Sequence, residues 1–203
     1  MLIAALRHNR AASRRHAFFQ TSSPVTTSPF VVLVGLPGSG KSTVGRQLAR
    51  RMNVSFTDSD HAIEQRIGCT IREYFEREGE PAFRDVEESV ILDITRQGQG
   101  VLATGGGAVL RPGNRRRLHE AGHVIYLRST PEEVFRRVRH DSNRPLLQVR
   151  DPLERLRSLY EDRDPLYRET AHFVLETGRP TVRTLVNIIL TQLELAGVAS
   201  QRP

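Results

Sequence analysis

The residues best suited to chemistry form the stretch Gly-Leu-Pro-Gly-Ser-Gly-Lys-Ser at 35–42. It matches the pattern G-x-x-x-x-G-K-S, in which backbone N–H groups surround a phosphate at the start of a helix. Lys41 can reach the outer phosphates of a nucleotide, and the hydroxyl of Ser42 can bind Mg²⁺. The stretch follows an apolar run at 30–35 and precedes helical spacing, which is the context of a working phosphate loop. The residues predicted to bind nucleotide here are Gly38, Ser39, Gly40, Lys41, Ser42 and Thr43.

A pair of carboxylates in "TDSD" at 57–60 is the second candidate for chemistry. We expect Asp58 and Asp60 on a short strand at 54–60, where alternate residues point to the same side. One carboxylate can hold a water bound to Mg²⁺, and the other can meet the hydroxyl of a phosphoryl acceptor. A solvated turn is the structural alternative, and the preceding phosphate loop makes it the weaker one.

Two further loops carry residues of interest. "TGGGAV" at 104–109 places Gly105, Gly106 and Gly107 in a row, which allows something to approach the backbone closely. "SNRPLL" at 142–147 joins a basic helix to an acidic, loop-like segment. Arg144 precedes a proline and is expected to be extended on a mobile lid. From there it can add positive charge over a transferring phosphoryl group.

The elements that must position these residues alternate along the chain. Short apolar runs predict buried strands, and the stretches between them have helical spacing, as in 80–97 and in 130–140. Strands separated by helices predict right-handed crossovers and a mainly parallel sheet with ligands at the carboxyl ends of its strands. The fold class expected is a three-layer α/β/α domain with five strands, at 30–35, 54–60, 100–106, 123–129 and 171–177.

Composition limits the class of protein. The 203 residues carry a net charge of +7, one cysteine and no tryptophan. Cys69 alone cannot form an intrachain disulfide, and we expect a small, partly buried thiol. No stretch approaches the roughly 20 apolar residues that span a bilayer. Scattered arginines and few aromatic rings favour small anionic ligands over specific nucleic-acid binding.

The ends of the chain differ from the middle. Residues 1–28 contain no acidic residue and end in a Ser/Thr/Pro-rich stretch. Two interpretations remain open: a disordered basic extension of a cytoplasmic protein, which we favour, or a transit peptide for a plastid or another organelle. We expect one P-loop domain at 29–198, a short tail at 199–203, and a monomer.

Together these motifs resemble the shikimate kinase family over nearly all of the chain from about Phe30 to Ala196. The motifs are "GLPGSGKST", "DSDHAIEQRIGCTIREYFEREGEPAFRDVE", "TGGGAV", "NRPLL" and "RDPLYRETA". The second is the most specific, because it joins an acid pair to an arginine within a fixed span. The resemblance implies a P-loop NTPase-like fold with a mobile lid, and ATP-dependent phosphorylation of the 3-hydroxyl of shikimate.

The resemblance also implies roles for individual residues. Asp60 and the glycines Gly105, Gly106 and Gly107 would bind the shikimate hydroxyls, and Arg84 and Arg163 its carboxylate. Arg144 would be the lid arginine over ATP, and Ser42 and Asp58 would organise Mg²⁺. Catalysis would rest on Lys41, Asp60 and Arg144. Arg179 and Pro180 are predicted to contact adenine, and Arg137 is a weaker candidate for stacking there.

Other functions on the same scaffold remain to be separated from this one. A gluconate kinase or a nucleoside monophosphate kinase would share the phosphate loop but should lack the acid, arginine and glycine set. A non-catalytic module that senses ATP or a ring carboxylate is a rival of another class. It would need a partner domain, and about 28 residues at the N-terminus are too few for one.

Overall fold

The computed structural model describes residues 29–139 and 150–198. Strand β1 (Phe30–Val34) lies in the middle of the sheet, and all of its residues are buried. Its alternate side chains enter opposite layers. Val32 and Val34 belong to one hydrophobic cluster, and Val31 and Leu33 to the other. A strand that is apolar on both faces is typical of a parallel sheet covered on both sides.

Five strands form the sheet in the order β2-β3-β1-β4-β5, and every pair of neighbours is parallel. The predicted fold class is therefore confirmed. The second and third strands are shorter than predicted, with three and four residues, because a helix begins at Ser59 and the glycine-rich segment leaves the sheet after Ala103. Besides β1, the strands are β2 (Phe56–Asp58), β3 (Gly100–Ala103), β4 (His123–Arg128) and β5 (Phe173–Glu176).

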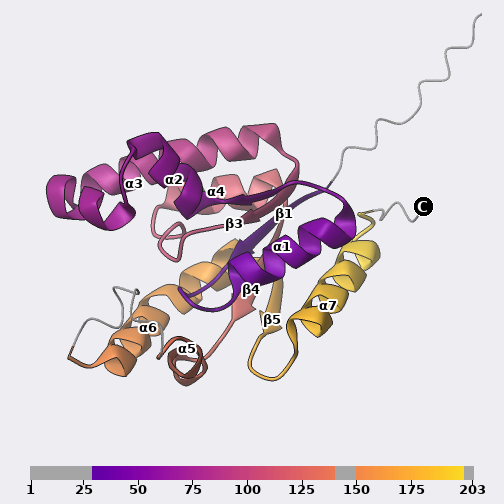
Figure 1. Ribbon diagram of the computed structural model, residues 1–203. Helices are drawn as coiled ribbons and strands as arrows, with labels where there is room; N and C mark the ends of the chain where they lie inside the picture. The colour runs from indigo at the N-terminus through magenta and orange to yellow at the C-terminus, as the bar shows by residue number, and fades with distance from the viewer. Residues whose placement is uncertain (1–28, 140–149, 199–203) are drawn as a thin grey trace, which may run out of the picture.

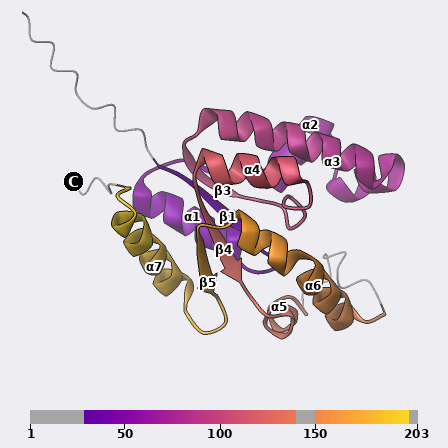
Figure 2. The ribbon, with the colours of Figure 1, turned by 180° about the vertical axis from the view of Figure 1, so that it is seen from behind.

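Helices cover both faces of the sheet (Figures 1 and 2). One face packs against α1 (Lys41–Met52) and α7 (Val182–Leu195). The other packs against α3 (Ile71–Gln97), α4 (Pro112–Ala121), α5 (Pro131–Val138) and α6 (Pro152–Thr170). The short α2 (Ser59–Ile67) packs on α3 through a third, smaller cluster. The result is the three-layer arrangement that the alternation of strands and helices predicts.

Helix α6 corrects one expectation from the sequence. The segment after position 147 was expected to be loop-like, yet 19 of its residues form a helix whose N-terminus is capped by the side chain of Asp151. Most of the helix surface is charged, and the apolar positions that face the core are few, with Leu156, Leu159 and Tyr167 buried. The weak periodicity explains why the sequence alone did not reveal it. Since Arg163 lies on α6, this helix decides where that guanidinium points.

Capping boxes mark the N-termini of two helices that the sequence analysis recognised. Thr130 forms a capping box with Glu133 and is followed by Pro131 at the first position of α5, as predicted. Thr70 forms a second capping box, with Glu73, so that α3 begins well before the predicted 80–97. Gly79, with a φ of 80°, interrupts the helical conformation of α3. Across the described ranges, no helix is long and apolar enough to cross a bilayer.

Candidate active site

The loop between β1 and α1 has the backbone that a phosphate loop requires. Gly38 and Gly40 have positive φ angles of 84° and 97°, which residues with a Cβ rarely adopt. Lys41 begins α1, and its buried Nζ donates to the carbonyl oxygens of Gly35 and Leu36 at 2.8 Å each. The predicted strand–loop–helix arrangement is confirmed, and the lysine ammonium lies within the loop.

Ser39 is suited to a ligand at this loop. Its side chain is 2% exposed, and its Oγ has no hydrogen-bond partner in the described part of the chain. A buried hydroxyl without a partner is costly, so a ligand atom at the loop would satisfy it. The residues predicted to bind nucleotide share one turn and the start of α1: Gly38, Ser39, Gly40, Lys41, Ser42 and Thr43.

Ser42 and Asp58 meet across the ends of α1 and β2. The Ser42 hydroxyl donates to Oδ2 of Asp58 at 2.7 Å. Asp58 also caps α2, with its Oδ1 accepting from the backbone N–H of Asp60 at 3.1 Å. Among residues 29–139 and 150–198, no group of three or more His, Cys, Asp or Glu could hold a metal. A hydroxyl and one carboxylate nevertheless suit Mg²⁺, which binds oxygen and usually keeps several waters.

Asp60 is not where the strand pattern placed it. It lies in the first turn of α2, after β2 has ended at Asp58, so the two carboxylates do not share a strand face. The reason is the cap, because the Asp58 side chain starts a helix at the very next residue. Burial in the surrounding protein, followed by repulsion from Asp58, raises the pKa of Asp60 to about 6, although Lys41 opposes the shift. Part of the residue is nevertheless exposed to solvent, so water screens part of this effect.

The three consecutive glycines are packed against other candidate site residues. A Cβ at Gly105 would overlap the carboxylate of Asp60, and one at Gly107 would lie 2.6 Å from Nη2 of Arg84. A Cβ at Gly106 would lie 2.6 Å from Cδ of Pro37 in the phosphate loop. Close approach to this backbone was predicted from the sequence. The structure shows that three side chains of the protein itself make that approach.

Arg84 is held in place by two glutamates on its own helix. Its Nη1 donates to Glu87 at 2.7 Å, and its Nη2 donates to Glu80 at 2.9 Å. The side chains of Arg84 and Glu87 are only 12% and 2% exposed, whereas that of Glu80 is 59% exposed. Burial raises the pKa of Glu87, and the charge of Arg84 opposes this rise. Glu87 is a residue that the sequence analysis missed, although it is the last residue of the longest quoted motif, which ends in "AFRDVE".

Arg163 approaches the glycines from α6. Its Nη1 donates to the carbonyl oxygen of Gly106 at 3.0 Å. The hydroxyl of Tyr167, four residues later, donates to the same oxygen at 2.6 Å. The structure thus brings Arg84 and Arg163, which lie 79 positions apart in the sequence, to adjacent members of one glycine run. Tyr167 is a second residue that the sequence analysis missed, although it lies within the quoted motif "RDPLYRETA".

Arg137 lies at the other side of the phosphate loop. Its guanidinium donates to the Ser129 hydroxyl at 3.1 Å and to the carbonyl oxygen of Thr177, and reaches the Ser39 carbonyl oxygen at 3.5 Å. It therefore links the phosphate loop to the ends of β4 and β5. Arg179 and Pro180 come shortly after β5, which ends at Glu176. They therefore follow the carboxyl end of that strand, and their contact with adenine stays a prediction. Arg144 lies outside the described residues.

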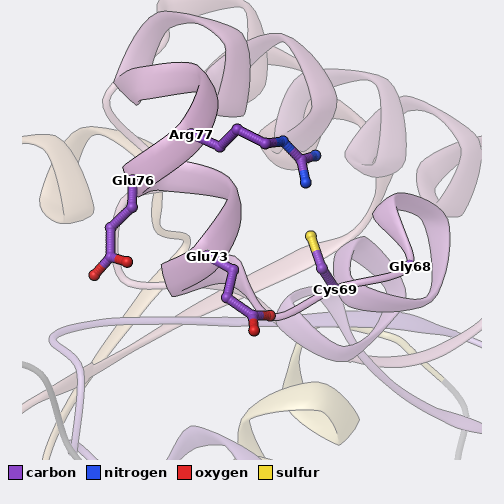
Figure 3. Close-up of a pocket in the computed structure, with 5 residues that line it drawn as sticks. All are labelled: Gly68, Cys69, Glu73, Glu76 and Arg77. Atoms are coloured by element: carbon purple, nitrogen blue, oxygen red, sulfur yellow. The ribbon is translucent and has the colours of Figure 1, made fainter.

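A separate hollow of about 630 Å³ lies between the turn that joins α2 to α3 and the first turns of α3 (Figure 3). Gly68, Cys69, Glu73, Glu76 and Arg77 line it, and none of these is a predicted site residue. Cys69 is partly buried, as expected, and Figure 3 shows its thiol toward Arg77. This hollow is distinct from the cluster around the glycines.

A family model described as shikimate kinase matches residues 37–194. The chain belongs to the shikimate kinase family. A shikimate kinase of Paracidovorax citrulli is 62% identical over 174 residues, covering 84% of this chain and 95% of that protein. One of Burkholderia thailandensis is 57% identical over 171 residues, covering 84% and 93%. The family assignment agrees with the motifs. It favours a shikimate kinase over a gluconate kinase or a nucleoside monophosphate kinase.

A solved structure supports the same assignment at the level of the fold. A shikimate kinase from Acinetobacter baumannii in complex with shikimate aligns with a TM-score of 0.78 and 46% identity. The alignment covers 85% of this chain and 96% of that one. In this chain, Asp60, Arg84 and Arg163 lie around the glycine run.

Proposed function

We propose that this chain transfers the terminal phosphoryl group of ATP to the 3-hydroxyl of shikimate, giving shikimate 3-phosphate and ADP. The reaction is a step toward chorismate and the aromatic amino acids. One observation carries the proposal beyond family membership: Gly106 contacts the phosphate loop through Pro37 and accepts a hydrogen bond from Arg163. A site for a carboxylate-bearing acceptor thus adjoins a site for a triphosphate.

The acceptor would be held by hydrogen-bond donors at its carboxylate and by a hydrogen-bond acceptor at one of its hydroxyls. Arg84 and Arg163 supply guanidiniums for its carboxylate, since forked donors match two carboxylate oxygens better than an ammonium does. Asp60 accepts from a ring hydroxyl and orients it toward ATP. The glycine run offers backbone groups to the remaining hydroxyls. An acceptor with hydroxyls and one carboxylate explains why acids and arginines meet at this candidate site.

The phosphoryl transfer forms a bond between the acceptor oxygen and the γ-phosphorus and breaks the bond from that phosphorus to the β-bridging oxygen. The proton of the hydroxyl leaves toward Asp60 or water. Lys41 stabilises the charge on the transferring group, and the backbone N–H groups of the loop hold the phosphates. Arg144, placed by its motif alone, would add a further cation.

Ser42 and Asp58 are the residues that would hold Mg²⁺. The ion, when bound, neutralises charge on the phosphate oxygens. We further propose that the protein acts in the cytoplasm as a monomer, with no specific nucleic-acid partner. The basic composition of residues 1–28 makes salt-dependent gel retardation the direct check of that last point.

The test is a coupled assay of ADP release with shikimate, gluconate and AMP offered separately. We expect turnover with shikimate alone. Lys41→Ala should lower kcat by about 100-fold or more, because it removes electrostatic stabilisation of the transferring group. Arg163→Ala should raise the KM for shikimate by about 10–100-fold, with little change for ATP, because a charge-assisted hydrogen bond is lost. Turnover with gluconate or AMP instead would contradict the proposal.

A further inference from the structure

We infer that Tyr167 is a positioning residue for the acceptor: its hydroxyl fixes the carbonyl of Gly106, so that Arg163 can leave that carbonyl for the substrate carboxylate. The inference rests on the proposed function, since it takes shikimate as the acceptor. It adds a role for a residue that the proposed function does not place against either substrate. It also explains why one backbone carbonyl has two side-chain donors.

The two donors come from one face of α6. Arg163 and Tyr167 are four residues apart, so they lie one above the other on the helix. Both reach the carbonyl oxygen of Gly106, at 3.0 and 2.6 Å. A carbonyl oxygen has two lone pairs and can accept both. Either donor can therefore depart and leave the oxygen satisfied.

The two donors differ in their freedom to move. Tyr167 is fully buried, and its ring lies against that of Tyr126 with centroids 5.0 Å apart. Burial also raises the pKa of the Tyr167 phenol above its ordinary value, so the hydroxyl keeps its proton. Arg163 is only partly buried and has five N–H donors, of which Nη1 is on Gly106. The tyrosine is thus the fixed donor, and the arginine is the one that can change partner.

Gly106 and its two neighbours are closely packed against other parts of the candidate site. Its Cα hydrogens face Pro37 of the phosphate loop, where a methyl group would not fit. Its neighbours, Gly105 and Gly107, adjoin Asp60 and Arg84. If the carbonyl of Gly106 turned when Arg163 moved to substrate, the whole glycine run would shift against these side chains. A fixed donor from the core prevents that movement.

Tyr126 provides a matched control for a purely structural role. It is as fully buried as Tyr167, packs against the Tyr167 ring, and donates one hydrogen bond, to Asp164 at 2.8 Å. Its hydroxyl has no hydrogen bond to the glycine run. Tyr126→Phe and Tyr167→Phe therefore remove the same group from neighbouring positions in the core. Only the second removal should affect the acceptor.

The experiment measures KM for shikimate and for ATP, kcat, and the melting temperature of the full chain and both variants. We expect Tyr167→Phe to raise the KM for shikimate about fivefold or more, as for the loss of one hydrogen bond. The KM for ATP should stay within about twofold. Both variants should lower the melting temperature by similar amounts. Tyr126→Phe should leave both KM values within about twofold. Equal KM changes for both substrates, or an unchanged KM for shikimate, would overturn the inference.

A second variant keeps the inference testable if Tyr167→Phe does not fold. Arg163→Met leaves Tyr167 as the only side-chain donor to Gly106. We expect it to weaken shikimate binding, measured by calorimetry, while ATP binding and the melting temperature stay close to those of the unaltered protein. A parallel loss of ATP binding would mean that Arg163 holds the turn, and the role of Tyr167 would be wrong. The proposed function itself fails only if the unaltered chain forms no ADP with shikimate, so the two failures are distinguishable.

Discussion

The guanidinium of Arg84 lies directly on the backbone of Gly107. A Cβ built at this glycine would be 2.6 Å from Nη2 and 2.8 Å from Cζ of the arginine. The missing side chain is therefore the space in which the arginine lies. This relationship links a helix face and a loop from separate parts of the chain, and it places the glycine beside an arginine of the proposed acceptor site.

Gly107→Ala should displace Arg84 and harm the use of shikimate. The φ of Gly107 is not positive, so the cost is steric, and overpacking of this kind costs about 1–3 kcal/mol. We expect the KM for shikimate to rise about tenfold or more, with the KM for ATP nearly unchanged. Gly113→Ala is the control, since a Cβ there meets only the end of the flexible Glu88 side chain. Equal changes of the KM for shikimate in both variants would show that the position of Arg84 does not depend on the missing side chain at Gly107.

Glu87→Gln should weaken the hold on Arg84 without changing the size of the side chain. The pair is buried and joined at 2.7 Å, and a hydrogen bond between charged groups contributes about 1.5–3 kcal/mol. We expect about a tenfold rise in the KM for shikimate. Glu80→Gln, which alters the exposed partner of the same arginine, should change it less than about twofold. A larger effect at Glu80 than at Glu87 would contradict this order.

Asp58→Asn should increase the requirement for Mg²⁺. The carboxylate accepts from the Ser42 hydroxyl, and substitutions around metal ligands lower metal affinity about 10–100-fold. We expect the Mg²⁺ concentration for half-maximal turnover to rise by about tenfold or more. Asp93→Asn removes a carboxylate from an exposed ion pair with Arg66 and should leave it unchanged. An unaltered Mg²⁺ titration for Asp58→Asn would exclude Asp58 from the metal site.

Acidification should lower the stability of the protein through His172, which lies just before the edge strand β5. The His172 ring stacks on that of His119, with centroids 4.0 Å apart, and its Nδ1 accepts from the backbone N–H of Val124. Burial, followed by the charges of His119 and His123, lowers the pKa of His172 below its ordinary 6.5. The unfolded chain then binds more protons than the folded chain, so the stabilisation is present above about pH 6.5 and is lost as pH falls through the lowered pKa.

His172→Asn tests this directly, because its amide oxygen can still accept from Val124 and the side chain does not titrate. We expect the melting temperature of the unaltered chain to fall more between pH 7.5 and 5.5 than that of the variant. The difference should be only about 1–2 °C, because His172 is exposed enough for solvent to screen its charge. Identical changes in both proteins would show that His172 does not contribute.

Much of the site could be predicted because its signals are local. Gly38, Gly40 and Lys41 need a strand before them and a helix after them, and both are visible as apolar patterns in the sequence. A capping box such as that of Thr130 lies within four residues. The alternation of strands and helices then fixes a parallel sheet with its ligand edge on one side.

Only the tertiary structure decided which side chains meet at the candidate site and in what order. Asp60 was placed on a strand because the pattern is ambiguous where Asp58 both ends β2 and caps α2. The role of Tyr167 depends on burial and on a partner in a distant segment, about which composition and spacing carry no information. Glu87 lies three residues from Arg84 on the same helix, but only the fold shows that this pair is buried. The sequence determined the chemistry available to this protein. The packing of α3 and α6 around one glycine run determined its geometry, because only folding brings residues so far apart in the chain within hydrogen-bond distance.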